Sequence, residues 1–324
     1  MEFNKNILKI DTEEVASKLE EFIRDKVKNF FRMKGIVIGL SGGIDSAVAA
    51  ALSVRAVGAE RVFGVLLPEA DSSPLSRELG RLMAENLGIE YEEVDITPML
   101  ESFGVYEKRD RIVKKHFPDI SGGYKFRLSL PQDLLEKSTL NVYYLEVKTE
   151  DGKVLKARLP HEDFLGMMAA NDIKQRTRMT QLYYEAEKRH YVVCGTTNRS
   201  EAVQGFFVKY GDGGVDIEPL STLYKDQIYQ LGEYLGIPKE ILSRTPSPDT
   251  YSYEVSDKEF YFRLPYETVD MILYAMENNI DKETVAKSLK LDMDQLERAW
   301  GDLERKYRAT EHLRQMPPVP DNIP

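Results

Sequence analysis

The chain has 324 residues, 42% hydrophobic and 30% charged, which favours a globular protein with a sizeable core, in one large α/β domain or two smaller ones. Its formal net charge of −10, without a basic block, argues against tRNA or DNA as a substrate and predicts no nucleic-acid partner. The single cysteine, Cys194, excludes an internal disulfide and a cysteine-based zinc site. The sequence also lacks a membrane-length apolar run and a signal-peptide pattern, so we expect a cytoplasmic protein without a membrane partner.

The first hundred residues alternate helices and strands. Residues 11–32 show helical spacing of apolar side chains, with Asp11 or Thr12 as the N-cap. Short β-branched runs then predict three strands separated by helices, at 35–38, 61–67 and 89–96 for the strands and at 47–54 and 73–87 for the helices. This order predicts a doubly wound, mostly parallel sheet with helices on both faces. Ligands of such sheets bind at the carboxyl ends of the strands.

A glycine-rich loop joins the first strand to the next helix. It reads Gly39-Leu40-Ser41-Gly42-Gly43-Ile44-Asp45-Ser46. Glycine permits positive φ and close approach of a ligand, and main-chain N–H groups at a helix N-terminus can cradle phosphate oxygens. The loop is neither a Gly-Lys-Ser/Thr phosphate loop nor a Gly-x-Gly-x-x-Gly motif. The simpler alternative is an ordinary turn in which Asp45 caps the helix.

Residues 105–160 interrupt the alternation. Runs at 141–148 and 153–159 are rich in β-formers and flank Asp151-Gly152, a good hairpin signal. We therefore expect an inserted β-hairpin subdomain at about 105–160 within one domain covering 1–324. A lid, a dimer contact and mere decoration are all compatible with this segment.

The α/β pattern resumes after residue 161. We expect a long helix from Asn171 to about Lys188, a buried strand at 191–194, and a polar turn and helix start at 195–201. Residues 206–216 form a glycine-rich stretch, and Lys225 enters the following helix. The rest reads as helical, at 264–277, 282–289 and 293–307, which we interpret as helices packed on the sheet rather than as a DNA-binding pair.

Four motifs in this order carry a family resemblance. The glycine loop resembles the pyrophosphate loop of the ATP-pyrophosphatase superfamily. With Asn-x-x-Lys-x-Arg-x-Arg-Met at 171–179, Gly-Thr-x-Asn-x-Ser-Glu at 195–201 and Lys-Tyr-Gly-Asp-Gly-Gly-x-Asp at 209–216, the chain resembles the ammonia-dependent NAD synthetases over about 1–100 and 161–324. This resemblance implies an adenine nucleotide alpha-hydrolase-like fold. It also implies adenylation of deamido-NAD by ATP, with release of pyrophosphate, and displacement of AMP by ammonia.

The resemblance also assigns residue roles. Asp45 and Lys225 would be catalytic, and Asp45 and Glu201 would hold Mg²⁺. The residues that would bind ATP are Gly39, Ser41, Gly42, Gly43, Asp45, Ser46, Thr196, Lys225 and Ser247, the last standing where the family usually has threonine. Deamido-NAD would contact Arg176, Lys209, Asp216 and His312. The family further implies a homodimer whose deamido-NAD site lies at the subunit interface.

Each assignment has a simpler alternative. Asp212 and Asp216 could shape a glycine turn, and Glu201 could be a solvated acid in the first turn of a helix. Arg176 and Arg178 could pair on the helix surface, with Glu185 or Glu187 as partners. Cys194, in an apolar strand, is expected to be a core residue rather than a nucleophile.

Two departures from the family pattern keep other functions open. Leu313 stands where the family has a lysine after His312, and the segment 105–160 is additional. One alternative is a pyrophosphate-loop ligase that amidates another carboxylic acid in a specialised pathway. Another is a nucleotide-binding protein that has lost catalysis, against which the intact loop and Glu201 argue. The chain has no room for a glutaminase domain, so nitrogen is expected as free ammonia or from a separate glutaminase.

Overall fold

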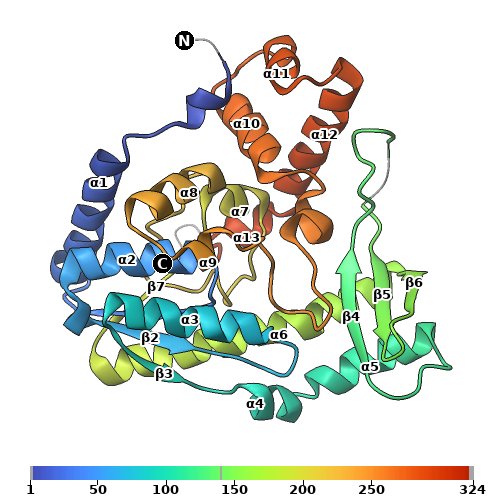
Figure 1. Cartoon of the computed structure of the whole chain (residues 1–324), viewed down its shortest axis with the longest axis horizontal. Coiled ribbons are helices and arrows are strands. Elements are labelled where there is room, and N and C mark those ends of the chain that lie inside the picture. The colour runs from blue at the N-terminus through green and yellow to red at the C-terminus, as the bar shows by residue number, and fades with distance from the viewer. Residues whose placement is uncertain (1–2, 139–140, 321–324) are drawn as a thin grey trace.

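A four-stranded parallel sheet forms the centre of the computed structural model, which describes residues 3–138 and 141–320 (Figure 1). The strand order is β3-β2-β1-β7, and every neighbouring pair is parallel. The strands are β1 (Ile36–Gly39), β2 (Val62–Leu66), β3 (Glu90–Glu93) and β7 (Val192–Cys194). This confirms the α/β fold class predicted from the alternation of strands and helices.

Alternate residues of the central strands point to opposite faces of this sheet, and each face is covered. Ile36 and Ile38 belong to a core built with α1 (Thr12–Asp25), continued by the π-helical turn η2 (Lys26–Phe30), and with four further helices: α2 (Ile44–Val57), α3 (Pro74–Leu87), α8 (Lys225–Tyr234) and α9 (Lys239–Leu242). Val37 and Val193 instead pack on side chains of α6. Asp11 is the N-cap of α1, accepting a hydrogen bond from the Glu14 N–H.

The middle of the chain forms a second, antiparallel sheet. After α4 (Thr97–Ser102) and α5 (Val105–His116) come β4 (Tyr124–Ser129), β5 (Tyr144–Thr149) and β6 (Val154–Arg158). The expected hairpin is β5–β6, but β4 pairs on the other side of β5 and was not predicted, nor was α5. The link from β4 to β5 is long and carries no local turn signal. The limits of the insertion, which includes residues 139–140 outside the described part, stay a prediction.

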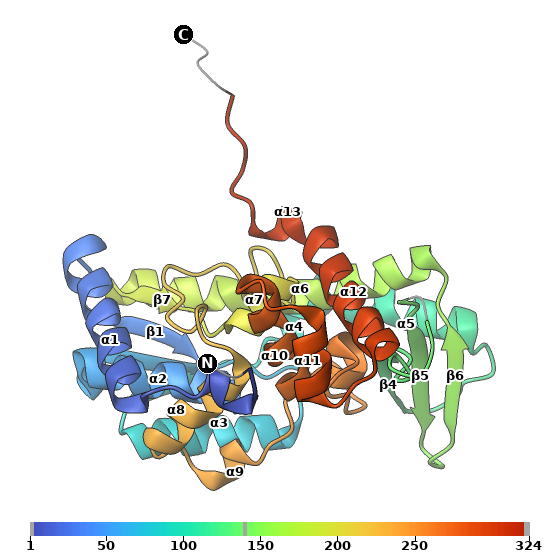
Figure 2. The ribbon, with the colours of Figure 1, turned by 90° about the horizontal axis from the view of Figure 1, so that it is seen from above.

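Helix α6 (His161–Arg189) begins ten residues before the position predicted for it. Its first turn carries Asp163, whose carboxylate accepts from Lys115 and His116 of α5, each at 2.8 Å. Acids in a first turn favour a helix N-terminus, and packing against α5 stabilises a segment whose sequence has no strong cap. The helix runs from the small sheet to the face of the parallel sheet (Figures 1 and 2).

The remaining helices form a separate layer with its own core. Three of them match the helices predicted for this region, namely α10 (Tyr266–Glu277), α11 (Lys282–Leu289) and α12 (Met293–Ala309). Their buried side chains pack with Phe3 and Leu8 at the start of the chain. The shorter elements are η1 (Lys5–Leu8), η3 (Ala59–Arg61), α7 (Arg199–Gln204), η4 (Lys258–Phe262) and α13 (Glu311–Arg314). Among the described residues, no helix combines the length and the apolar character that crossing a membrane requires.

Candidate active site

A cavity of about 500 Å³ opens at the carboxyl ends of β1, β2 and β7. Its lining includes Gly39 at the end of β1, Leu66 at the end of β2 and Cys194 at the end of β7. The walls are completed by α6, by residues 195–215 and by a loop at 244–250. A ligand here would meet main-chain groups at strand ends and helix N-termini, as the topology predicts.

The glycine loop folds around its own hydroxyl groups. Gly42 has φ +72°, and a Cβ there would lie 2.4 Å from the carbonyl oxygen of Ser76, so the position requires glycine. The Ser46 hydroxyl donates to the Gly43 carbonyl at 3.0 Å and lies 3.0 Å from the Ser41 hydroxyl. Gly39, Ser41, Gly43 and Asp45 therefore line the cavity, while the two other predicted loop residues, Gly42 and Ser46, shape the loop.

Asp45 does not cap its helix. Gly43 is the N-cap of α2 and makes no side-chain cap, and the Asp45 carboxylate points instead to two residues from distant elements. Its Oδ1 accepts from Asn198 Nδ2 at 2.9 Å and its Oδ2 from Lys225 Nζ at 2.5 Å. The interpretation of Asp45 as a capping residue is therefore wrong.

Lys225 lies between two carboxylates. Its ammonium group is 2.5 Å from Asp45 and 3.4 Å from Glu201, and its side chain is only 2% exposed. Burial disfavours the charge, but the attraction of Asp45 and Glu201 outweighs it and raises the pKa of Lys225. Glu201 is held by a capping box with Asn198 at the start of α7, so it is not the solvated acid of the simpler alternative.

A third carboxylate makes this cluster negative. Asp257 also lines the cavity and accepts from the Tyr266 hydroxyl at 2.9 Å. Burial raises the pKa of Asp257 to about 6, against the attraction of Lys225. Burial, opposed by Lys225 and reinforced by Asp45 and Asp257, raises the pKa of Glu201 to about 8. One ammonium thus faces three carboxyl groups, and the cluster favours a further cation.

The donor set of this cluster fits Mg²⁺. Carboxylate oxygens suit this hard ion, which proteins bind with one or two carboxylates together with substrate phosphates. In the described residues, no group of three or more His, Cys, Asp or Glu side chains is arranged to hold a metal by itself. Asp45 and Glu201 therefore need oxygen ligands from a bound phosphate to complete such a site.

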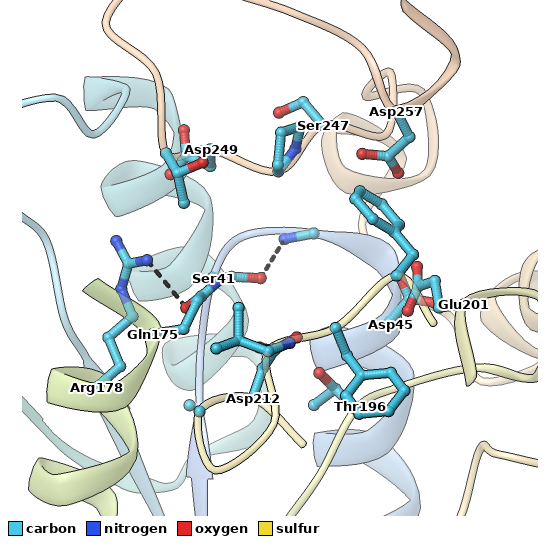
Figure 3. A pocket seen from close by; sticks show the side chains of 18 of the residues that line it. Ser41, Asp45, Gln175, Arg178, Thr196, Glu201, Asp212, Ser247, Asp249 and Asp257 are labelled. Atoms are coloured by element: carbon cyan, nitrogen blue, oxygen red, sulfur yellow. Dashed lines mark hydrogen bonds between the residues drawn. The ribbon is translucent and has the colours of Figure 1, made fainter. Parts of the chain in front are cut away.

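Two arginines flank the opposite side of the glycine loop. Arg178 of α6 donates to the Leu67 carbonyl at 3.2 Å and to Gln175 at 3.1 Å (Figure 3). Arg244 donates to the Ser76 hydroxyl at 2.5 Å and to the Ser41 carbonyl at 3.4 Å. Arg244 was not predicted, although a basic residue in a polar, proline-rich loop is the signal that points to it. These cations increase the anion affinity of the loop.

Arg178 and Arg176 do not form the surface pairs that the simpler alternative required. Both line the cavity, and the Arg176 Nε donates to the Lys209 carbonyl at 3.3 Å. Lys209 also lines the cavity, while its ammonium donates to the carbonyls of His312 at 3.0 Å and Gln315 at 2.9 Å. The structure thus brings these motif residues together on one wall of the cavity.

Two predicted substrate residues do not line the cavity. Asp216 accepts from the Val193 N–H at 2.8 Å and from the Tyr183 hydroxyl at 3.1 Å, so its carboxylate joins β7 to α6. His312 contributes its carbonyl to Lys209, and its neighbour Leu313 lines the cavity instead. Thr196 and Ser247, predicted to bind ATP, do line it.

Aromatic side chains line a further part of the cavity. Tyr143 stacks on Phe164 with ring centroids 4.4 Å apart, and Phe206 stacks on Tyr261 at 4.7 Å. These four residues and Phe260 line the cavity. Tyr143 comes from the segment between β4 and β5, so the small sheet contributes to the site, which the sequence did not indicate.

Cys194 and Asp212 also line the cavity; Cys194 is buried and Asp212 is partly buried. Burial raises the pKa of the Cys194 thiol to about 12, which makes it a core residue rather than a nucleophile. Asp212 accepts from the Val208 N–H at 2.9 Å and so shapes the glycine turn. Burial also raises the pKa of Asp212 to about 6.

Known proteins match the chain over most of its length. The family model described as NAD synthase matches residues 15–118 and 132–317. The NH(3)-dependent NAD(+) synthetase of Rhizobium meliloti (strain 1021) is 42% identical over 311 residues, which are 96% of this chain and 92% of that protein. The protein of the same name from Thermotoga maritima is 41% identical over 263 residues, covering 81% of this chain and 87% of that protein.

Solved structures share the fold. An NH3-dependent NAD synthetase from Campylobacter jejuni, in complex with the nitrate ion, is 25% identical with a TM-score of 0.63, covering 96% of this chain and 100% of that one. An NMN synthetase from Francisella tularensis is 24% identical with a TM-score of 0.66, covering 97% and 100%, and at that identity shows the fold alone. The matched family residues include 132–160, which carry β5, β6 and Tyr143. This chain therefore belongs to the NAD synthase family.

Proposed function

We propose that the chain is a ligase that amidates deamido-NAD to NAD with ammonia, using ATP and releasing AMP and pyrophosphate. The observation that carries this proposal is the Asp45–Lys225–Glu201 cluster beside a phosphate-cradling loop, in one cavity of a chain matched along almost its whole length by NH(3)-dependent NAD(+) synthetases. ATP activates the acid as an acyl-adenylate, and ammonia then displaces AMP to form the C–N bond.

ATP phosphates lie on the glycine loop in this proposal. The loop N–H groups and the Ser41 hydroxyl bind them, and the N-terminus of α2 attracts their charge. Thr196 and Ser247 complete the ATP site. Lys225 carries a positive charge that burial does not remove, and it stabilises the negative charge that develops as pyrophosphate leaves.

Asp45 and Glu201 would hold Mg²⁺ together with those phosphates. When bound, the ion offsets phosphate charge and orients the leaving group. Asp45 positions Lys225 through their direct contact, and Asn198 orients the Asp45 carboxylate. The chain's own residues thus hold the ammonium group of Lys225 beside the loop.

The acid substrate lies toward α6 and α13. Arg176 and Lys209 line the cavity there and suit the phosphates and carboxylate of a dinucleotide. Asp216 acts indirectly, by joining β7 to α6. His312 accepts from Lys209 through its carbonyl, next to the lining residue Leu313. We further propose a homodimer, a cytoplasmic location, and free ammonia or a separate glutaminase as the nitrogen source, all resting on the family resemblance and the composition.

A product assay tests this function. The purified chain is incubated with ATP, Mg²⁺, ammonium and deamido-NAD, while AMP, pyrophosphate and NAD are followed together. Equal amounts of NAD and AMP are the expected result. AMP release only with a different carboxylic acid would move the function to another amide ligase, and no ATP turnover with any acid would contradict catalysis altogether.

A further inference from the structure

The segment 249–259 carries cavity residues yet belongs to no sheet. Asp249 and Asp257 project from it into the cavity, facing Ser41 and Asp45 (Figure 3). Asp249 has φ +47°, a conformation that a residue with a side chain seldom adopts, so its neighbours must hold it. Its carboxylate accepts from the Ser73 N–H at 3.2 Å and lies 3.7 Å from Arg244.

Lys174 of α6 holds the start of this segment. Its ammonium group makes three hydrogen bonds, to the Thr250 carbonyl at 2.8 Å, to Glu69 at 2.9 Å and to Asp71 at 2.7 Å. The lysine side chain is 2% exposed, and Thr250 is buried. Because Glu69 and Asp71 belong to the loop after β2, one ammonium joins three segments: this loop, α6 and residue 250.

Helix α5 completes the charges of this cluster. Arg109 donates to Asp71 at 2.7 Å, and the Tyr106 hydroxyl donates to Glu69 at 2.8 Å. Two carboxylates therefore face two cations, and each carboxylate has a second donor besides Lys174. A buried cluster that is balanced in this way fixes the groups around it, since each member depends on the others.

Strand β4 holds the rest of the segment. The Tyr253 N–H donates to the Phe126 carbonyl at 3.0 Å, and the Phe126 N–H donates to the Ser252 hydroxyl at 3.0 Å. Farther along, the Leu130 N–H donates to the Glu259 carbonyl at 2.8 Å. Tyr251 packs edge-on against Phe126, with ring centroids 5.5 Å apart. The small sheet thus supports the back of a cavity wall.

We propose that Lys174 and β4 are a positioning device for the reaction, fixing segment 249–259 between them so that Asp249 and Asp257 face the glycine loop. Lys174 touches no cavity ligand in this role and acts through Thr250 and the loop after β2. The segment 105–160 therefore serves the active site, by supplying Arg109 and β4. The kinetic part of this inference rests on the proposed function, whereas its structural part does not.

The test combines amide hydrogen exchange with kinetics on Lys174→Met. In the ligand-free variant, we expect the amides of Tyr253 and Asp257, which are hydrogen-bonded in the native chain, to exchange about tenfold faster, while the amides of β1 and β7 keep their protection. In the product assay, the KM for ATP should rise about tenfold with the KM for the acid nearly unchanged, because Ser247 and the loop after β2 lie on the ATP side.

Lys188→Met is the matched control, since it removes a half-exposed lysine from the same helix, and its buried partner Glu185 keeps the ion pair with Arg189. It should leave exchange and both KM values unchanged. Should Lys174→Met fail to fold, Ser252→Ala removes only the hydroxyl that accepts from Phe126 and leaves every charge in place; we expect the same pattern with a change of about threefold.

Hydrogen exchange distinguishes failure of the positioning role from failure of the proposed function. Unchanged exchange at Tyr253 and Asp257 in a folded variant would overturn the positioning role, whatever the assay shows. Faster exchange without any turnover by the native chain would leave the positioning role standing and reject the proposed function. Faster exchange with an unchanged KM for ATP would also overturn the proposal, because the segment would then not serve the reaction.

Discussion

Two lysines of this chain are equally buried, but the charges around them differ. Lys174 and Lys225 are each 2% exposed, and each contacts two carboxylates. The carboxylates around Lys174 are balanced by Arg109, and the third proton of its ammonium goes to a backbone carbonyl. Around Lys225, Asp257 adds a third acid that no second cation offsets in the described residues.

This difference separates a structural cluster from a binding site. A buried ion pair with all its partners stabilises the conformation around it, whereas unbalanced charge costs stability until a ligand arrives. The Lys225 cluster, with acids of raised pKa, is the one that opens onto the cavity. Substitutions in the two clusters should therefore affect activity and stability differently.

Asp45→Asn is expected to give the largest effect. It removes one of the two proposed Mg²⁺ ligands and the charge that holds Lys225, so turnover should fall by about 10³-fold or more. The melting temperature should change little, because Asn198 and the loop remain. Turnover is followed by AMP release, with Asp11→Asn, at the N-cap of α1, as the control. Turnover within tenfold of the native chain would remove Asp45 from the mechanism.

Glu69→Gln should instead act on stability. It removes the charge of a fully buried carboxylate that accepts from Lys174 and Tyr106, and the free energy of unfolding should fall by about 3 kcal/mol. Urea unfolding measures this. Glu14→Gln, which breaks only the exposed pair with Lys18, should cost about 0.5 kcal/mol or less. Equal losses in the two variants would contradict the structural role of the Lys174 cluster.

Arg176→Ala sharpens the comparison within the cavity itself. The loss of a cation from the wall proposed for the acid should raise the KM for deamido-NAD about tenfold, and the KM for ATP much less. Arg308→Ala, which removes an exposed arginine paired with Glu304, is the control. A KM for the acid that does not change would count against this role of Arg176.

Asp257→Asn should make the ligand-free protein more stable at high pH. Burial raises the pKa of Asp257 to about 6, above the ordinary value of 3.8, so the folded protein holds a proton that the unfolded chain has released. This group therefore lowers stability as pH rises through about 4 to 6. The variant should gain at most about 3 kcal/mol relative to the native chain at about pH 8, and about 0.5 kcal/mol or less at about pH 4. Parallel curves of stability against pH for the two proteins would show that folding does not raise the pKa of Asp257.

Local patterns predicted most of the elements but few of the long-range contacts. Strands and helices around the glycine loop follow from periodicity and glycine placement, and the motif order indicated the family. Strand β4 and the early start of α6 were missed because each depends on partners distant in sequence, β5 and α5 respectively. A local signal for either is weak, since tertiary packing decides it.

In the candidate site, too, local motifs predict some of the residues and only the fold explains the others. Residues in motifs, such as Thr196 and Lys209, reach the cavity as expected. Asp216 belongs to a motif as well, but its carboxylate accepts hydrogen bonds from the Val193 N–H and the Tyr183 hydroxyl, which lie beside this half-buried acid. Tyr143 belongs to no motif, and only the fold of the small sheet brings it to the cavity.

The stacked pair of Tyr143 and Phe164 has an evolutionary consequence. The two rings come from residues just before β5 and at the start of α6, whereas the glycine loop and Lys225 come from segments before and after this part of the chain. Substitutions in 130–165 can therefore alter the cavity lining at Tyr143 and Phe164 without changing the residues proposed to bind phosphate. Exchange of this segment between relatives would therefore change one part of the cavity lining and leave the glycine loop and Lys225 as they are.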